Sequence, residues 1–268
     1  MIIEGRTFII SGGASGLGLA TAHLLTAKGG YVSILDLSKT DQDALFTSFP
    51  SISKSSSRVK FFPCDVTFSD SISTAIAGTV GWINQTHASL AGIIACAGIS
   101  WPAKIIDRDG NPMDMPTAKK VIEVNVFGTL DFIRLALPHL ITVPPHGPDG
   151  ERGVVIMVAS SAAFDGQPGQ VSYAASKGAI RSATLPMARD LARYGVRVVS
   201  IAPSLFDTNM TKGMGGKARE SLVRVMEWPR RAGRGEEFAH LVEAVMENTM
   251  MNGECIRLDG AVRMPSKM

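Results

Sequence analysis

A tyrosine and a lysine with a spacing suited to proton transfer lie in the run VSYAASKGAI. Tyr173 and Lys177 are four residues apart, so in a helix they occupy one face. A free phenol has a pKa near 10 and is a poor base at neutral pH, but a neighbouring ammonium favours the phenolate. Such a pair could act as a base in proton transfer. Because the spacing also arises by chance, its place at the start of a helix that follows a strand gives it weight.

A second motif is the glycine-rich run SGGASGLG, which follows an apolar strand and opens a helix. Gly12, Gly16 and Gly18 have the spacing G-x-x-x-G-x-G. Glycines in such a turn let backbone N–H groups approach a pyrophosphate at a helix N-terminus. By motif matching alone, a purely structural turn is the alternative. Gly13 has no explanation beyond the geometry of the turn.

An acidic residue at the end of the next strand favours one nicotinamide cofactor over the other. Asp36 lies 18 residues after Gly18. A carboxylate at this point accepts hydrogen bonds from the adenosine ribose and repels a 2′-phosphate, so we expect NAD rather than NADP. An ordinary loop acid is the alternative. Asp65 and Val66, after the third strand, are expected beside the adenine ring.

These residues are separated by strand-like and helix-like runs that alternate along the chain. Apolar strands are predicted at 6–12, 31–37, 58–66, 90–98, 153–161, 196–204 and 254–260, and helices at 17–30, 70–87, 117–140, 171–195 and 236–248. Continuous apolar strands between helices indicate a parallel sheet covered on both faces. We therefore predict a single-domain, doubly wound α/β Rossmann fold of about seven strands over residues 1–268. Residues 204–235 break the alternation and are long enough for a substrate lid.

Composition excludes several classes of protein. With 45% hydrophobic and 19% charged residues and a net charge of +3, nothing points to nucleic acid. No apolar run has the roughly 20 residues that a membrane span needs. The five histidines show no ligand spacing, so no metal is predicted. The three cysteines, Cys64, Cys96 and Cys255, are far apart and form no CxxC pair. This favours reduced thiols in a protein inside the cell.

In the order of these motifs the chain resembles the short-chain dehydrogenase/reductase family over essentially its full length. The resemblance rests on the glycine turn, the pair Asp65-Val66, the run CAGI at 96–99, and a set of four polar residues, Asn125, Ser160, Tyr173 and Lys177. It implies that these four residues are catalytic. It also implies a cofactor site built from Gly12, Ser15, Gly16, Leu17, Gly18, Asp36, Asp65, Val66, Cys96, Gly98, Tyr173, Lys177, Phe206 and Thr208.

The resemblance implies a mechanism in which Tyr173 is the base. Ser160, 13 residues earlier, hydrogen-bonds the substrate oxygen, with Ser161 as the alternative serine. Lys177 stabilises the phenolate together with the positive nicotinamide and holds the ribose hydroxyls. Asn125 interrupts an apolar helix, where its side chain and a water could link Lys177 to solvent. The structural alternative is that Asn125 only bends the helix.

Within the family the chain is most similar to the 3-hydroxyacyl-CoA dehydrogenase type 2 branch. This implies oxidation of a 3-hydroxyacyl-CoA in fatty-acid β-oxidation. The alternatives are a dehydrogenase of a steroid or another small secondary alcohol, and a non-catalytic NAD-binding protein. Two departures stand out: Ala95-Cys96 replaces two asparagines, and Ser204 follows Pro203 where the family has glycine.

The resemblance and the last residues make two further predictions. The family implies a homotetramer assembled through the helices at about 115–140 and 172–194 and the C-terminal strand region. The chain ends in Ser266-Lys267-Met268, close to the S-K-L address that the peroxisomal import receptor reads. We therefore expect a peroxisomal protein, with the cytoplasm as the alternative.

Overall fold

The protein is described from a computed structural model that covers residues 1–37, 41–49, 58–212 and 216–264. Seven parallel strands form one sheet in the order β3-β2-β1-β4-β5-β6-β7. The strands are β1 (Thr7–Ser11), β2 (Tyr31–Asp36), β3 (Val59–Pro63), β4 (Leu90–Ala95), β5 (Gly153–Val158), β6 (Val196–Pro203) and β7 (Cys255–Leu258). The predicted doubly wound sheet of seven strands is therefore confirmed.

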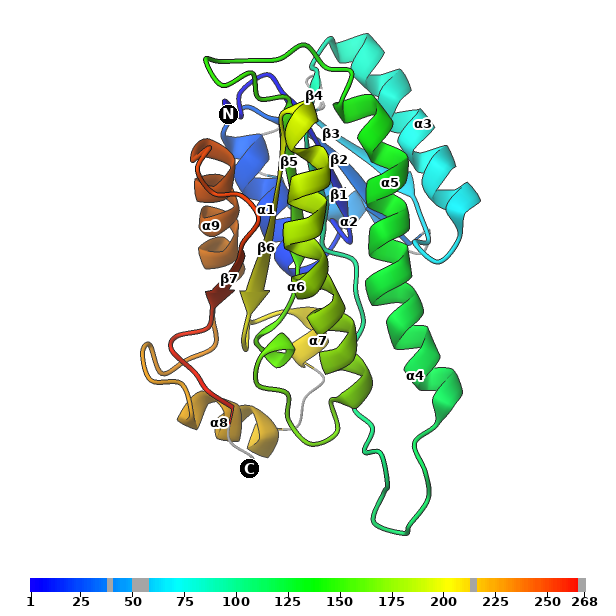
Figure 1. The fold of residues 1–268 in the computed structure, drawn as a ribbon, viewed down its shortest axis with the longest axis vertical. Coiled ribbons are helices and arrows are strands. Elements are labelled where there is room, and N and C mark those ends of the chain that lie inside the picture. The colour runs from blue at the N-terminus through cyan, green and yellow to red at the C-terminus, as the bar shows by residue number, and fades with distance from the viewer. Residues whose placement is uncertain (38–40, 50–57, 213–215, 265–268) are drawn as a thin grey trace.

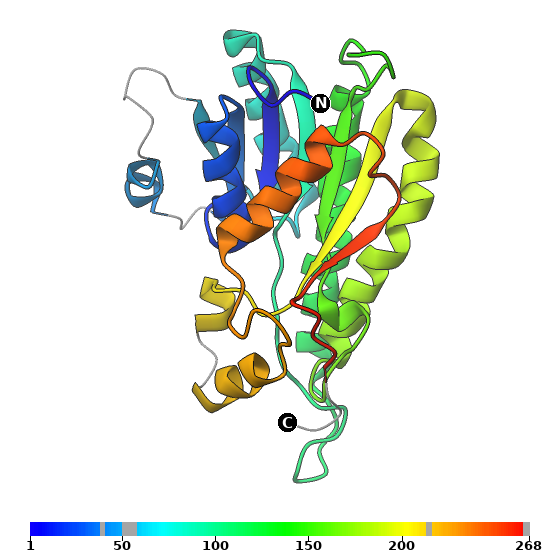
Figure 2. The same ribbon diagram turned by 90° about the vertical axis from the view of Figure 1, so that its left-hand side faces the viewer.

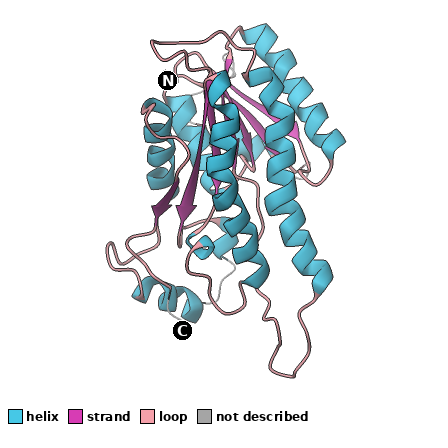
Figure 3. Ribbon diagram, viewed as in Figure 1, coloured by secondary structure: helices cyan, strands magenta, loops and turns pink. Residues whose placement is uncertain are grey.

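Helices cover both faces of the sheet (Figures 1 and 3). They are α1 (Gly16–Ala27), α2 (Gln42–Thr47), α3 (Ser69–Thr86), α4 (Met115–Ile122), α5 (Thr129–Leu140), α6 (Val171–Leu191), α7 (Asn209–Lys212), α8 (Gly216–Arg224) and α9 (Gly235–Glu247). Figure 2 shows α1 and α9 on one side of the sheet and α6 on the other.

The core consists of two layers, one on each face of the sheet. Neighbouring residues of a strand belong to different layers: Ile10 packs with α1 and α9, whereas Ile9 packs with α3 and α5. This follows from the alternation of side chains along a strand. Because both faces are covered, the central strand β4 is buried throughout and reads as a continuous apolar run.

The predicted helix at 117–140 is interrupted at its centre. Residues Glu123–Gly128 form a π-helical segment between α4 and α5, and it contains the fully buried Asn125. A π-turn widens a helix locally and is frequent where a side chain serves a site. The short helix α2 was not predicted; Asp41 begins it by accepting a hydrogen bond from the Ala44 N–H.

The segments that follow the carboxyl ends of the strands lie together at the lower end of the molecule in Figure 1. There α7 and α8 occupy the predicted segment 204–235. Leu205, Leu222, Met226, Ala232 and Val262 form a small apolar cluster that joins this segment to the residues after β7.

Candidate active site

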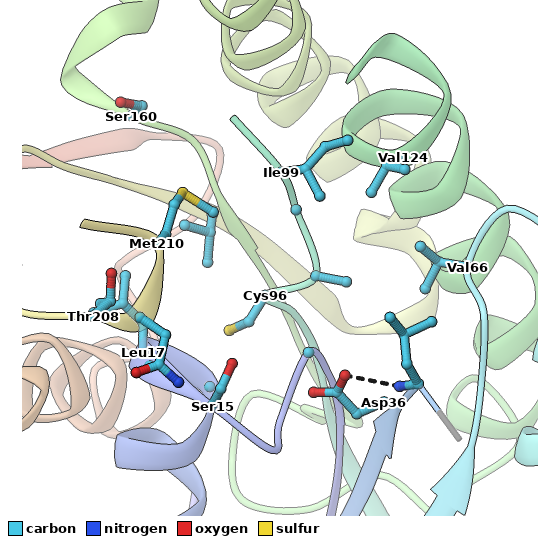
Figure 4. Close-up of a pocket in the computed structure, with 18 of the residues that line it drawn as sticks. Ser15, Leu17, Asp36, Val66, Cys96, Ile99, Val124, Ser160, Thr208 and Met210 are labelled. Atoms are coloured by element: carbon cyan, nitrogen blue, oxygen red, sulfur yellow. Dashed lines mark hydrogen bonds between the residues drawn. The ribbon is translucent and has the colours of Figure 1, made fainter. Parts of the chain in front are cut away.

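A pocket of about 630 Å³ opens at the carboxyl ends of the strands. Ser160 lines this pocket. So does every residue predicted to contact the cofactor, namely Gly12, Ser15, Gly16, Leu17, Gly18, Asp36, Asp65, Val66, Cys96, Gly98, Tyr173, Lys177, Phe206 and Thr208. Asn125 lies behind the pocket wall and does not line it. Figure 4 shows how Asp36, Cys96 and Thr208 surround the cavity.

The glycine-rich turn forms the floor of this pocket, and two of its glycines admit no side chain. Gly12 has a φ of +66°, and a Cβ there would lie 2.6 Å from the Ala97 nitrogen. A Cβ on Gly18 would collide with the Gly12 carbonyl oxygen. The turn and the tip of β4 therefore pack backbone against backbone. Gly13, unexplained by the sequence, packs on Ile10, whose carbonyl oxygen would lie 3.1 Å from a Cβ.

Asp36 ends β2 with its carboxylate held at the edge of the pocket. Its Oδ2 accepts a hydrogen bond from the Ala14 N–H at 3.0 Å. Its Oδ1 accepts one from the Leu37 N–H at 2.8 Å, and this second bond is the dashed line in Figure 4. The first of these bonds ties the end of β2 to the glycine turn. A ligand that extends from the glycine turn toward β2 would therefore meet the negative charge of this carboxylate.

The wall beyond Asp36 combines predicted and unpredicted residues. Asp65 turns its Oδ1 to the N–H and hydroxyl of Thr67, at 2.9 and 2.7 Å, so it shapes the loop after β3. Val66 and Val124 line the same side of the pocket in the view of Figure 4. Val124 and Lys120 were not among the residues predicted from the sequence. Lys120 and Val124 are four residues apart, which puts both on one helical face. This spacing is the signal that could have found them.

Ser160 and Tyr173 meet on the side of the pocket formed by β5 and α6. Ser160 begins a short 3₁₀ turn, and its Oγ accepts a hydrogen bond from the Ala162 N–H at 3.1 Å. Burial raises the pKa of Tyr173, and a hydrogen bond with Ser160 lowers it in part. Ser161 is buried and does not line the pocket, so the geometry favours Ser160 over it.

Lys177 reaches the pocket one helical turn after Tyr173. Its Nζ donates a hydrogen bond to the Val158 carbonyl oxygen at 2.7 Å and lies 5.9 Å from the centre of the Tyr173 ring. Burial lowers the pKa of Lys177 to about 8, whereas burial raises the pKa of the nearby Cys96 thiol to about 12. Lys177 therefore changes charge more readily than an ordinary lysine, and the Cys96 thiol remains protonated.

Asn125 fixes the backbone behind the pocket and does not itself hydrogen-bond Lys177. Its Oδ1 accepts from the Ile99 N–H at 2.8 Å, and its Nδ2 donates to the Ile99 carbonyl oxygen and to Ser176 Oγ at 2.9 and 3.0 Å. A Cβ on Gly98 would lie 3.2 Å from Asn125 Oδ1 and 3.5 Å from Lys177 Nζ. The chain after β4 is therefore held against α6 next to Lys177.

The segment after β6 completes the pocket above the glycine turn. The Thr208 side chain would be 3.3 Å from a Cβ on Gly16, and its N–H donates to Thr211 Oγ1 at 3.1 Å. Phe206 is buried, with its ring edge against Phe238. Residues at the ends of six strands, β1 to β6, thus converge on one cavity, the place where doubly wound sheets bind ligands.

The residues that the structure describes hold neither a candidate metal site nor a helix that could span a membrane. Within residues 1–37, 41–49, 58–212 and 216–264, no three His, Cys, Asp or Glu side chains are grouped to hold a metal ion. In the same ranges, no helix has the length and apolarity needed to cross a membrane.

Comparison with known proteins agrees with this geometry. Residues 6–218 match the family model described as short chain dehydrogenase. The chain is 40% identical to human 3-hydroxyacyl-CoA dehydrogenase type-2, covering 98% of this chain and 97% of the human protein, and 38% identical to that of Drosophila melanogaster. A crystal structure of 3-hydroxyacyl-CoA dehydrogenase type-2 from Mycobacterium avium superimposes with a TM-score of 0.87 at 34% identity, covering 98% of both chains. The chain therefore belongs to the short-chain dehydrogenase family of oxidoreductases.

Proposed function

We propose that the protein is an NAD-dependent 3-hydroxyacyl-CoA dehydrogenase that interconverts a 3-hydroxyacyl-CoA and a 3-ketoacyl-CoA. One observation supports it above the others: Ser160, Tyr173 and Lys177 line the same pocket as the glycine turn. The acyl-CoA substrate is inferred from the relatives named for that activity, which match along nearly the whole chain.

The residues of the pocket fit a nicotinamide dinucleotide. At Gly12 and Gly18 a side chain would collide with backbone, which leaves backbone groups to form the floor that a pyrophosphate needs. Asp36 would accept the ribose hydroxyls and repel a 2′-phosphate, which supports NAD over NADP. Val66 and Val124 would hold the adenine ring, and Phe206 and Thr208 the nicotinamide end.

In the proposed reaction the protein orients the alcohol and moves its proton. NAD⁺, when bound, supplies the acceptor for the hydride that leaves the carbinol carbon. Ser160 Oγ would hydrogen-bond the substrate oxygen, and the Tyr173 phenolate would take its proton. Burial in the protein raises the pKa of Tyr173, so a positive charge nearby is needed to stabilise the phenolate. Lys177, one turn away, would supply part of it.

Reduction of acetoacetyl-CoA by NADH tests the proposal. The wild-type chain should turn over, and Tyr173→Phe should lose at least about 100-fold in kcat because it cannot donate or accept the proton. Tyr194→Phe is the matched control, since Tyr194 does not line the pocket. Absence of turnover by the wild type would reject this substrate. Turnover of a steroid or a simple secondary alcohol in its place would establish the alternative. Equal rates for wild type and Tyr173→Phe would reject the mechanism.

We further propose that residues 204–235 act as a substrate lid over the one NAD-binding domain, and that the protein is a homotetramer. Most of the buried apolar residues of this segment form a small cluster of their own, apart from the two main core layers, which supports the lid. The exposed apolar side chains Phe127, Val171 and Leu185 on the long helices support assembly through those helices. Light scattering after size-exclusion chromatography should give four copies, and Phe127→Asp should give smaller species.

We propose a peroxisomal location, which suits β-oxidation. The tripeptide Ser266-Lys267-Met268 that supports it lies outside the described residues. A fluorescent protein that carries the last twelve or so residues of the chain at its own C-terminus should form puncta with a peroxisomal marker, and the same fusion without the tripeptide should be diffuse. A diffuse signal for both fusions would reject the address.

A further inference from the structure

The turn that begins with Ser160, called here the serine turn (residues 160–165), is closed by its own hydrogen bonds. The hydroxyl and carbonyl oxygens of Ser160 accept from the N–H groups two and three residues further on, at 3.1 and 2.9 Å. The Phe164 and Asp165 N–H groups both donate to the Ser161 carbonyl oxygen at 3.0 Å. The turn is therefore one short unit, and a contact that holds its end also restrains Ser160 at its start.

Arg257, on the edge strand β7, holds the end of the serine turn through two contacts (Figure 2). Its Nη2 donates to Asp165 Oδ2 at 2.7 Å, and its guanidinium carbon lies 4.7 Å from the centre of the Phe164 ring. The side chains of Arg257 and Asp165 are 17% and 24% exposed, so water screens this ion pair less than one at the open surface.

The guanidinium of Arg257 is itself fixed by the residues that follow β7. Its Nε donates to Asp259 Oδ2 at 2.5 Å, and its Nη2 also donates to the Val262 carbonyl oxygen at 2.9 Å. Because a guanidinium presents its N–H groups in a rigid planar fork, these bonds set the direction in which it meets Asp165. The end of β7 is thereby tied to the serine turn, which lies 92 residues earlier in the chain.

The Phe164 ring also connects the serine turn to the helix of the proposed base. The guanidinium carbon of Arg181 on α6 lies 4.1 Å from the centre of this ring. The same helix carries Tyr173, which forms a hydrogen bond with Ser160. Contacts from β7 and from α6 therefore meet at the end of the turn that places Ser160 beside Tyr173.

We propose that Arg257 is a positioning residue, which acts through Asp165 and Phe164 to hold Ser160 toward the substrate oxygen. The inference rests on the proposed function. In that reaction Ser160 must lie within hydrogen-bond distance of the substrate oxygen, and a displacement of about 1 Å can cost about 100-fold in rate. Neither Arg257 nor Asp165 lines the pocket, so neither should affect binding of the cofactor.

Substitution of Arg257 separates its effect on the reaction from any effect on cofactor binding. Arg257→Met should lower kcat for acetoacetyl-CoA by about 10-fold or more, with a smaller change in KM and an unchanged Kd for NADH. Arg263→Met is the matched control, because Arg263 donates to the same Asp259 oxygen at 3.4 Å and to the Val262 carbonyl oxygen rather than to the serine turn. The control should keep the wild-type kcat. An unchanged kcat in Arg257→Met, or an equal loss in both variants, would overturn the role.

A double variant tests whether Arg257 acts through Asp165. Asp165→Ala removes the same ion pair from the other side and should also lower kcat. Because the two residues act through one contact, the double variant should lose little more than the larger single loss. Losses that multiply would show that the two residues act independently, which contradicts the proposal. Asp165→Ala leaves Arg257 bonded to Asp259, so it carries the kinetic test by itself if Arg257→Met does not fold.

Hydrogen exchange measured by mass spectrometry needs no turnover. A peptide across residues 160–167 should exchange faster in Arg257→Met than in wild type, whereas peptides from α9 and β1 should not change. Unchanged exchange in that peptide, or equal acceleration throughout the molecule, would overturn the role. A wild type that does not reduce acetoacetyl-CoA would reject the proposed function instead, and exchange would still decide whether Arg257 holds the serine turn.

Discussion

Asn125 binds both backbone polar groups of Ile99, accepting from its N–H at 2.8 Å and donating to its carbonyl oxygen at 2.9 Å. The π-helical segment that carries Asn125 and the chain that leaves β4 are thereby joined by one side chain. This buried contact connects the sheet to the helix wall beside Lys177.

Replacing Asn125 by alanine should therefore destabilise the protein and distort the pocket. The Ile99 N–H and carbonyl group would lose their partner, and a buried unsatisfied polar group costs about 1–3 kcal/mol. We expect a loss of at least about 2 kcal/mol in urea unfolding and a fall in kcat. Asn252→Ala is the control, because Asn252 Oδ1 accepts one hydrogen bond from the Val198 N–H away from the pocket. If Asn125→Ala unfolded like the wild type, Asn125 would have no such structural role.

The lowered pKa of Lys177 predicts a pH-dependent difference in stability. Burial lowers it from 10.5 to about 8, so between these values the unfolded chain binds more protons at this residue. The contribution of Lys177 to folding is therefore unfavourable below about pH 8 and improves as pH rises toward 10.5. The free energy of unfolding of Lys177→Met should exceed that of wild type by the largest amount at pH 7. This difference, on the order of a few kcal/mol, should be lost by pH 10.

Urea unfolding of the cofactor-free protein at several pH values measures this difference. Cys96 and Tyr173 titrate near Lys177, but both are present in the two proteins, so the comparison largely removes their contribution. A difference that does not change with pH would show that Lys177 has an ordinary pKa in the folded state.

Asp36 should set the choice of cofactor. Wild type should prefer NADH to NADPH, and Asp36→Ala should reduce that preference by about 10- to 100-fold because hydrogen bonds to a charged group are lost. Asp36→Asn keeps an acceptor for the Ala14 N–H but removes the charge. If repulsion of the 2′-phosphate is the cause, Asp36→Asn should gain NADPH binding as well. A wild type that prefers NADPH would contradict the assignment of NAD.

Two glycine-to-alanine substitutions should have opposite effects on stability. Gly12→Ala brings a Cβ to 2.6 Å from the Ala97 nitrogen at a positive φ, and we expect a loss of about 2–4 kcal/mol and of NADH binding. Gly81 lies in α3 with nothing within 4 Å of a Cβ, so Gly81→Ala should stabilise by about 0.5–1 kcal/mol. Urea unfolding of both variants checks the pair. Similar stabilities would show that the turn is not tightly packed.

Much of the fold could be predicted because its signals are local. The apolar run 90–98 and the helical run 171–195 differ from β4 and from α6 with its final 3₁₀ turn by only a few residues. The interruption at Asn125 was visible as a polar residue in an apolar helix. The π-turn was not visible, and neither was the partner of Asn125, Ile99, which lies 26 residues away. The helix α2 lacks a strong periodic pattern and was missed for that reason.

The sequence alone determined the order of the elements, the glycine turn, Asp36 and the Tyr173–Lys177 spacing, because each is a pattern of neighbours along the chain. Only the tertiary structure decided which residues meet. It placed Val66 and Val124 in one pocket, put Ser160 rather than Ser161 there, packed Gly12 on Ala97, and left the Ser204 hydroxyl without a partner. Those relationships arise from how strand ends and helices pack in three dimensions, and such contacts join residues far apart in the chain.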